Sequence, residues 1–242
     1  MRRTRRLAAI GGAAVGLAAA GWCAPAPAPS IPAVAAAFAI RRRLGRPGIA
    51  ITFDDGPHRL GTPAVLDHLA RRGVVATFFL IGEQVDRHPS IAAEIVAAGH
   101  EVALHGHRHT LLLRRTPRAL EDDLDRATAS IEDATGRSPS CYRPPYGVFS
   151  MGGLRLCRRR GWEPTLWSRW GRDWGAHDRP DRIARRASSS LVSGDIILLH
   201  DADDYSAPGC WRGMSEALPS ILDAALASGE PLVAVTPEPT SA

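Results

Sequence analysis

From about residue 48 onward, short apolar runs alternate with longer amphipathic stretches. Several of the apolar runs are continuous and rich in β-branched or aromatic residues, which is typical of strands covered on both faces. They predict strands at residues 49–53, 74–80, 101–104, 140–142, 163–167, 195–199 and 232–235. The stretches between them have the spacing of helices and predict helices at residues 63–71, 91–98, 117–134, 154–160, 180–191 and 214–227.

Helix-boundary residues support this division of the chain. Thr116 stands directly before Pro117, a typical helix start, and Gly136 follows the same stretch as a typical helix end. Strands that alternate with helices predict an α/β fold, with a mostly parallel sheet and helices outside it. Neither an internal repeat nor a second domain is apparent in residues 47–242. In such folds the ligand site lies beyond the carboxyl ends of the strands.

Composition narrows the class of protein. The chain has 242 residues, of which 45% are hydrophobic and 23% charged, and this argues against disorder, collagen and a multi-span membrane protein. The net charge is +5, and all 30 basic residues are arginine. Residues 1–46 hold eight of these arginines and no acid, so the remaining 196 residues have a net charge of −3. The basic charge therefore lies in a terminal segment, and we do not expect a nucleic-acid partner.

The first 46 residues read as an export segment and a tether. Residues 1–24 have a basic start and an apolar stretch diluted with Gly and Ala, and they predict a signal peptide or an N-terminal anchor. Residues 25–46 are rich in Pro, Ala and Arg and predict a linker, in which the arginines at 41–43 form a charged tether or, alternatively, a solvated juxtamembrane patch. We expect an exported protein, by the general or the twin-arginine route, that touches a membrane only through residues 1–24 if they remain uncleaved.

Polar residues that can act in catalysis or bind a metal ion follow most of the predicted strands. Asp54 and Asp55 follow the first, His105 and His109 the third, Arg143 the fourth, Asp173 the fifth and His200 the sixth. Two histidines and one carboxylate form a common ligand set for Zn²⁺ or a similar divalent ion. Neighbouring aspartates point to different sides of an extended segment, so one can bind metal while the other takes a proton from water. The pattern predicts metal-assisted hydrolysis, with His200 as proton donor.

These residues stand in motifs that resemble the polysaccharide deacetylase family, also called carbohydrate esterase family 4 or the NodB homology domain. The resemblance extends from about residue 48 to 235. The matching motifs are Thr-Phe-Asp-Asp-Gly-Pro at 52–57, His-Gly-His-Arg-His at 105–109, Arg-Pro-Pro-Tyr-Gly at 143–147 and Leu-Leu-His-Asp at 198–201. Two positions depart from the family pattern. Gly106 replaces the usual Ser or Thr, and Trp170 stands where an Asp is usual.

The resemblance implies a role for each site residue. Asp54 is the implied catalytic base, and Asp55, His105 and His109 are the implied metal ligands. Arg143 orients Asp54, the backbone N–H of Tyr146 stabilises the oxyanion, and Asp173 orients the general acid His200. The implied substrate contacts are Leu198, for the acetyl methyl group, together with Trp167, Trp174 and Pro144. Buried core positions remain an alternative for the two tryptophans.

The expected protein is therefore a single-domain, distorted (β/α) barrel of about seven strands. Residues 47–242 form the catalytic domain, which acts as a monomer on a glycan. It holds one divalent ion, Zn²⁺ or alternatively Co²⁺, Ni²⁺ or Mn²⁺. We expect it to remove N-acetyl groups from N-acetylglucosamine units of peptidoglycan or a chitin-like oligosaccharide. The alternatives are an O-acetyl esterase acting on xylan or another acetylated glycan, a non-catalytic glycan-binding domain and a structural cell-surface protein.

Overall fold

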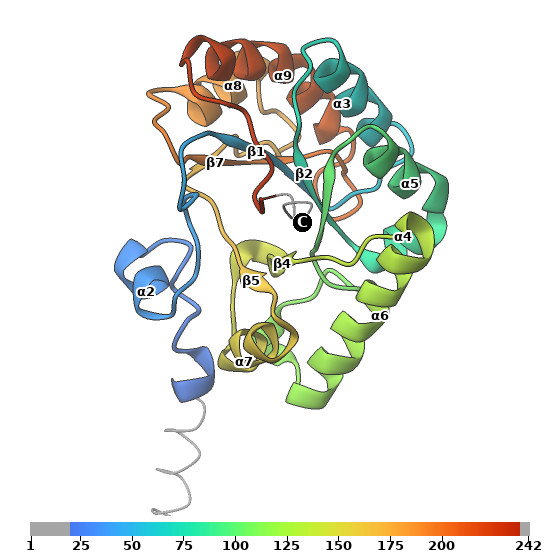
Figure 1. Ribbon diagram of the computed structural model, residues 1–242, viewed down its shortest axis with the longest axis vertical. Helices are drawn as coiled ribbons and strands as arrows, with labels where there is room; N and C mark the ends of the chain where they lie inside the picture. The colour runs from blue at the N-terminus through green and yellow to red at the C-terminus, as the bar shows by residue number, and fades with distance from the viewer. Residues whose placement is uncertain (1–19, 238–242) are drawn as a thin grey trace, which may run out of the picture.

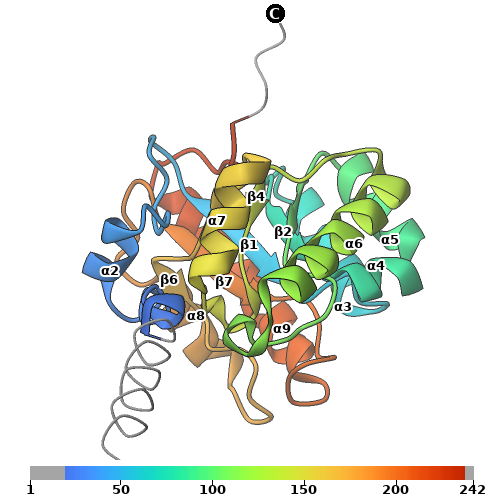
Figure 2. The same cartoon turned by 90° about the horizontal axis from the view of Figure 1, so that it is seen from below.

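The computed structural model describes residues 20–237, and its centre is one parallel sheet of seven strands. The strands lie in the order β5-β4-β3-β2-β1-β7-β6, and all neighbouring pairs are parallel. Their bounds are β1 Ala50–Asp54, β2 Thr77–Leu80, β3 Glu101–Leu104, β4 Cys141–Tyr142, β5 Glu163–Pro164, β6 Arg169–Trp170 and β7 Ile196–His200. The sheet is curled into a half-barrel and the helices lie outside it, as Figures 1 and 2 show. The predicted α/β barrel class is confirmed.

The helices follow the predicted alternation, with some different bounds. They are α2 Pro32–Ala37, α3 Gly61–Ala70, α4 Gly82–Arg87, α5 Pro89–Ala97, α6 Pro117–Thr135, α7 Met151–Arg160, α8 Pro180–Ser188 and α9 Cys210–Ala227. At the start of α6 the Thr116 side chain accepts a hydrogen bond from the Ala119 N–H, and Gly136 ends the helix with φ +67°. Such a cap satisfies a backbone donor that the helix itself leaves unpaired. The sequence analysis missed α2 and α4, because six residues are too few to show a helical period.

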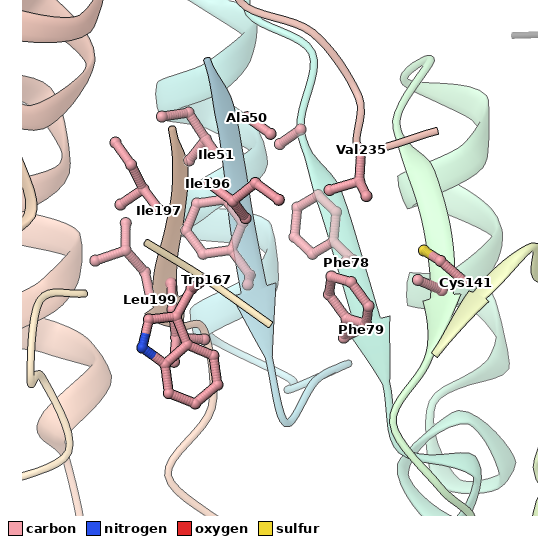
Figure 3. Packing of buried hydrophobic residues seen from close by; sticks show 14 of the residues in the cluster. Ala50, Ile51, Phe78, Phe79, Cys141, Trp167, Ile196, Ile197, Leu199 and Val235 are labelled. Atoms are coloured by element: carbon pink, nitrogen blue, oxygen red, sulfur yellow. The ribbon is translucent and has the colours of Figure 1, made fainter. Parts of the chain in front are cut away.

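The inside of the curled sheet is filled with apolar side chains. Every residue of β1 and β2 is buried, as expected for strands covered on both faces. Phe53 and Phe78 stack with their ring centroids 5.1 Å apart, and Figure 3 shows the surrounding packing. The register aligns Asp54 of β1 with His200 of β7. The central strands therefore bring two of the predicted catalytic residues side by side at their carboxyl ends.

One predicted strand, residues 163–167, is divided in the structure. Its start forms β5 and pairs with β4, whereas the next strand, β6, pairs with β7 at the opposite edge of the sheet. Four residues, 165–168, connect the two edges. The sequence could not show this break, because two-residue edge strands have no measurable period and are defined by tertiary pairing. The break also means that Asp173 follows β6, not β5.

Residues 25–46, predicted as a linker, pack onto the domain. The Arg41 N–H donates to Pro164 O (2.8 Å), and the Leu44 N–H donates to Gly194 O (2.8 Å), so this segment lies between the two edges of the sheet. Arg41 pairs with Glu163, and Arg43 pairs with Asp195. The arginine run is thus tied to the barrel by ion pairs and is not a solvated tether. We call residues 25–46 the N-terminal segment.

The predicted strand at 232–235 is not formed. Leu232 makes one isolated bridge with Ile49. The Val235 N–H instead donates to the side chains of Thr77 and Glu101, at 3.0 Å each, so this backbone donor is satisfied without a strand partner.

Residues 1–19 of the predicted signal or anchor lie outside the described residues. Between residues 20 and 237, no helix combines the length and apolar character needed to span a membrane.

Candidate active site

The polar residues predicted from the strand ends meet in one pocket. It has a volume of about 410 Å³ and lies beyond the carboxyl ends of β1, β3 and β7. Aspartate, histidine and aromatic side chains dominate its lining, which comprises Asp54, Asp55, His105, His109, Tyr146, Gly147, Trp167, Trp170, Trp174, Leu198, His200, Tyr205, Ser206 and Ala207. Carboxyl ends of parallel strands share one edge of the sheet, so residues 50 to 150 positions apart converge here.

Asp55, His105 and His109 form a triangle of potential metal ligands. Asp55 Oδ1 lies 3.4 Å from His105 Nε2 and 3.3 Å from His109 Nε2. One ligand atom from each residue lies within 4.8 Å of the other two. Asp55 directs its carboxylate here from a left-handed backbone conformation (φ +80°), which Asp adopts more readily than most residues. Oδ1 is buried and has no hydrogen-bond partner among the described residues.

The protonation of these residues suits a cation. The Nδ1–H of His105 donates to the Arg143 carbonyl (2.8 Å), which leaves the Nε2 lone pair facing Asp55. Burial lowers the pKa of His109 to about 4, so its ring is neutral at pH 7. Burial raises the pKa of Asp55, but the close approach of His105 and the charges of the nearby histidines outweigh burial and bring the pKa to about 2. A carboxylate and two imidazole lone pairs at this distance repel one another unless a positive charge lies between them.

Asp54 is held beside this triangle by a buried arginine. Arg143 is fully buried, and its Nη1 donates to Asp54 Oδ1 (2.5 Å) and to Thr52 Oγ1 (3.0 Å). Its Nη2 donates to Leu166 O (3.0 Å), and its guanidinium lies over the Phe79 ring, 3.9 Å from the centroid. Because Oδ1 is occupied by arginine, Oδ2 is the Asp54 oxygen available to a proton. It lies 3.8 Å from His105 Nε2.

His200, on the strand next to Asp54, forms a hydrogen-bonded pair with Asp173. Asp173 Oδ2 accepts the backbone N–H of His200 (2.7 Å), and Oδ1 lies 3.0 Å from His200 Nδ1. Burial lowers the pKa of His200, but the charge and hydrogen bond of Asp173 outweigh it, with help from Asp55 and Asp54, and the pKa rises to about 10. His200 is therefore cationic at neutral pH and has a proton to donate.

Three tryptophans line one wall of the pocket. Trp167 and Trp170 stack with centroids 5.8 Å apart, and Trp170 and Trp174 lie 5.3 Å apart. Trp174 is 39% exposed, whereas Trp167 is 8% exposed and belongs to both the pocket wall and the core. Leu198 lies opposite Trp170 in the register of β7 and β6 and adds a buried apolar surface. Exposed aromatic faces of this kind suit the apolar faces of sugar rings.

The Arg143–Gly147 loop places the predicted oxyanion donor Tyr146 and the predicted substrate contact Pro144 differently. Tyr146 lies in the 3-10 helix Pro145–Gly147, with φ +61° and a side chain that is 59% exposed and lines the pocket. Pro144 is buried and does not line the pocket. Its carbonyl accepts the Gly147 N–H (2.9 Å), so Pro144 shapes the turn that presents Tyr146.

Comparison with known proteins identifies the family. The model of the polysaccharide deacetylase family matches residues 41–162. A chitooligosaccharide deacetylase from a Bradyrhizobium species is 38% identical over 169 residues, which cover 68% of this chain and 77% of the relative. The chain belongs to the polysaccharide deacetylase family.

Solved structures share the fold of this polysaccharide deacetylase. The Bc1960 peptidoglycan N-acetylglucosamine deacetylase, crystallised with a hydroxamate, has a TM-score of 0.74 and 27% identity, over 81% of this chain and 89% of that one. A family pseudoenzyme from Bacillus anthracis has a TM-score of 0.71 and 23% identity, over 81% of this chain and 66% of that one. The second likeness shows the fold alone.

The departure at Gly106 is accommodated by a residue on α6. Gly106 has φ +103°, a conformation that strains any side chain. The loop is held through the next residue, because Asp123 Oδ2 accepts the His107 N–H (3.0 Å). Asp123 is in turn fixed by Arg115, whose Nη2 lies 3.1 Å from Oδ1. A buried carboxylate of α6 therefore supports the loop that carries His105 and His109.

A second cluster of potential metal ligands also has suitable spacing. It consists of His58, Asp203 and Asp204. Its hydrogen bonds favour a structural role. His58 Nδ1 accepts the Gly61 N–H (2.9 Å), so the proton of a neutral ring is on Nε2, which faces Asp203 Oδ1 at 3.3 Å. Asp203 also accepts the Gly209 N–H. This group ties the loop after β1 to the loop after β7.

Tyr205 is a site residue to which the sequence analysis assigned no role. Its ring stacks on His109 with centroids 4.5 Å apart and an interplanar angle of 14°. Its hydroxyl donates to Glu83 Oε1 (2.6 Å) and accepts from Gln84 Nε2 (3.0 Å), both on α4. His109 Nδ1 has no hydrogen-bond partner among the described residues, so aromatic packing by Tyr205 and Tyr146 orients its ring. Tyr205 lies in an irregular loop, where no periodic pattern marks it.

Replacing Tyr205 with Phe tests this positioning role. The ring still stacks, but its anchor to α4 is lost, so His109 is held less firmly. We expect the affinity for added Zn²⁺ to fall by about 10-fold, in the range observed for residues that orient metal ligands. Competition with a chromogenic chelator measures the affinity. Tyr142→Phe is the matched control, because the Tyr142 hydroxyl is buried without a partner among the described residues. Equal affinities in wild type and Tyr205→Phe would exclude the role.

Proposed function

We propose that this protein is a metal-dependent deacetylase that hydrolyses the N-acetyl groups of N-acetylglucosamine units in a polysaccharide and releases acetate. One observation carries the proposal: a buried carboxylate, Asp54, lies in one pocket with a ligand triangle and with a cationic histidine, His200, on the neighbouring strand. The names of the related chitooligosaccharide and peptidoglycan deacetylases support the same reaction and the same class of glycan.

The ligand triangle fits a divalent ion held by Asp55, His105 and His109. The unpaired Asp55 oxygen and the two Nε2 lone pairs supply one oxygen and two nitrogen donors, which suit Zn²⁺ and also Co²⁺, Ni²⁺ or Mn²⁺. When bound, such an ion supplies Lewis acidity toward the acetamide carbonyl and the attacking water.

The residues of the chain account for the proton transfers. Asp54, oriented by Arg143, accepts the proton of the attacking water through Oδ2. The backbone N–H of Tyr146 donates to the oxyanion that develops on the acetyl carbonyl. His200 then gives its proton to the departing amine, and Asp173 stabilises the imidazolium until that moment. Leu198 contacts the acetyl methyl group, and the tryptophan wall packs on the sugar ring.

An assay of acetate release against three substrates tests the proposal. The purified full chain is incubated with peptidoglycan, N-acetylchitooligosaccharides and acetylxylan, each with and without exhaustive chelation. We expect release from at least one of the first two, abolished by chelation and restored by added Zn²⁺. Release from acetylxylan alone would make the protein an O-acetyl esterase. Stoichiometric Zn²⁺ binding without release from any substrate would make it a glycan-binding domain. Release that persists after chelation would refute the metal-dependent mechanism.

We also propose a location and an oligomeric state for the protein. The basic, weakly apolar residues 1–24 favour export to the cell surface or the cell wall, with a membrane contact only if these residues remain attached. We propose that the protein acts as a monomer, in which one chain supplies the whole lining of the catalytic pocket.

A further inference from the structure

A second cavity lies next to the catalytic pocket, on the side of the N-terminal segment. It has a volume of about 500 Å³ and shares Tyr146, Trp167 and Trp170 with the catalytic pocket. Its far side is made by Ala26, Pro29, Ser30 and Arg42 of the N-terminal segment. Because the two cavities share three lining residues, they are direct neighbours. We call this second cavity the side groove.

Hydrogen bonds hold the N-terminal side of the groove in place. Arg42 Nη1 donates to the carbonyls of Ala28 and Pro29, both at 2.9 Å, and so folds the segment back on itself. Ala28 is fully buried. The family match begins at residue 41, so Ala26, Pro29 and Ser30 precede the part of the chain that the family model matches. This wall of the groove is therefore a feature of this chain that family membership does not imply.

Two arginines give the side groove a positive charge. Arg172 is exposed, and its guanidinium lies 4.6 Å from the centroid of the Trp170 ring. Within residues 20–237, no carboxylate lies within 4.0 Å of the guanidinium of Arg172 or Arg42, whereas the neighbouring Arg41 and Arg43 both form ion pairs. Neither of the two arginines that line the groove is thus neutralised by an acidic partner, and an anion bound there would be attracted by both charges.

We propose that the side groove is a subsite for a sugar unit that carries a carboxylate, next to the N-acetylglucosamine unit that is deacetylated. Trp170 offers a ring face for the sugar, and Arg42 and Arg172 bind the carboxylate. In a glycan the lactyl group of muramic acid that carries no peptide has this chemistry, so the inference favours peptide-free peptidoglycan strands over neutral chitin-like chains as the substrate. It rests on the proposed deacetylase function and specifies its substrate class.

The test compares two substrates of equal length. One is a tetrasaccharide of N-acetylglucosamine, which is neutral, and the other alternates N-acetylglucosamine with N-acetylmuramic acid, which is acidic. The readout is the ratio of kcat/KM for acetate release, acidic over neutral. We expect wild type to prefer the acidic substrate, and the preference to weaken with added salt, since screening reduces charge attraction. In the double variant Arg42→Gln/Arg172→Gln we expect the ratio to fall by about 10-fold, through KM.

Three further variants separate charge from structure. Arg172→Lys keeps the charge and should retain most of the preference, whereas Arg172→Gln alone should lower the ratio by about 3-fold without touching the bonds that Arg42 makes in the N-terminal segment. Arg118→Gln removes an exposed charge from α6 and should leave the ratio as in wild type. Thermal unfolding verifies that each variant is folded.

The outcomes distinguish the subsite from the function. A ratio that is the same in wild type, Arg172→Gln and the double variant would overturn the subsite while leaving deacetylation intact. If wild type releases acetate from neither substrate, the proposed function fails. Calorimetric titration with the acidic tetrasaccharide then tests the subsite by itself. Binding that the double variant weakens supports it, and binding that is absent or unchanged overturns it.

Discussion

Replacing Asp54 with Asn is expected to reduce kcat/KM for acetate release by about 10²–10⁴-fold, the contribution of a positioned general base. The amide has the shape of the carboxylate, and its oxygen can still accept a hydrogen bond from Arg143. It cannot accept the proton of the attacking water. The three ligands Asp55, His105 and His109 are untouched, so Zn²⁺ stoichiometry should remain that of wild type. The loss is measured as acetate release per mole of bound metal.

This variant also leaves the buried Arg143 without its anionic partner, which makes folding a necessary control. Removing one member of a buried ion pair typically costs about 3–5 kcal/mol of unfolding free energy, so we expect a lower Tm. Activity is therefore compared below the unfolding transition. Asp67→Asn serves as the matched control, because Asp67 is an exposed aspartate on α3. If Asp54→Asn retained more than about a tenth of wild-type kcat/KM, the base would have to be another group.

Asp54 could be predicted from the sequence because it lies at the end of a regular, buried strand. Buried central strands leave continuous apolar runs, and parallel strands align their carboxyl ends, so residues that follow such runs meet at one edge. Asp54 and His200 end strands of five residues, His105 follows a strand of four, and the structure brings all three to one pocket. The predicted convergence therefore needed only local patterns and the parallel arrangement.

The parts that the sequence did not reveal depend on tertiary contacts. β5 and β6 have two residues each, so only their partners, β4 and β7, define them as strands. The N-terminal segment has the composition of a linker, and it is ordered by ion pairs and backbone bonds to residues more than 100 positions away. Tyr205 stacks on His109 from a distant loop, and Glu83 and Gln84 hold its hydroxyl. No window of consecutive residues contains such information.

Replacing Asp173 with Asn is expected to have the second-largest effect, through His200. In wild type, burial favours neutral His200, and Asp173 overrides it and holds the pKa at about 10. Without that charge the pKa falls, because burial then dominates. The imidazolium is present below its pKa and lost above it, so the alkaline limb of the kcat/KM profile should move to lower pH. At neutral pH we expect a loss of about 10²–10³-fold in amide hydrolysis, within the contribution of a general acid.

Hydrogen-bond geometry strengthens this expectation. Asp173 accepts from both the backbone N–H and the Nδ1–H of His200, whereas Asn has only one acceptor oxygen. If that oxygen keeps the backbone N–H, the amide NH₂ faces Nδ1 and favours the neutral tautomer with its proton on Nε2. This species is a far weaker acid than the imidazolium. An activated aryl acetate, whose leaving group needs no proton, should therefore lose much less activity than the N-acetyl substrate. An unchanged pH profile, or equal losses on both substrates, would show that His200 is not the acid that Asp173 tunes.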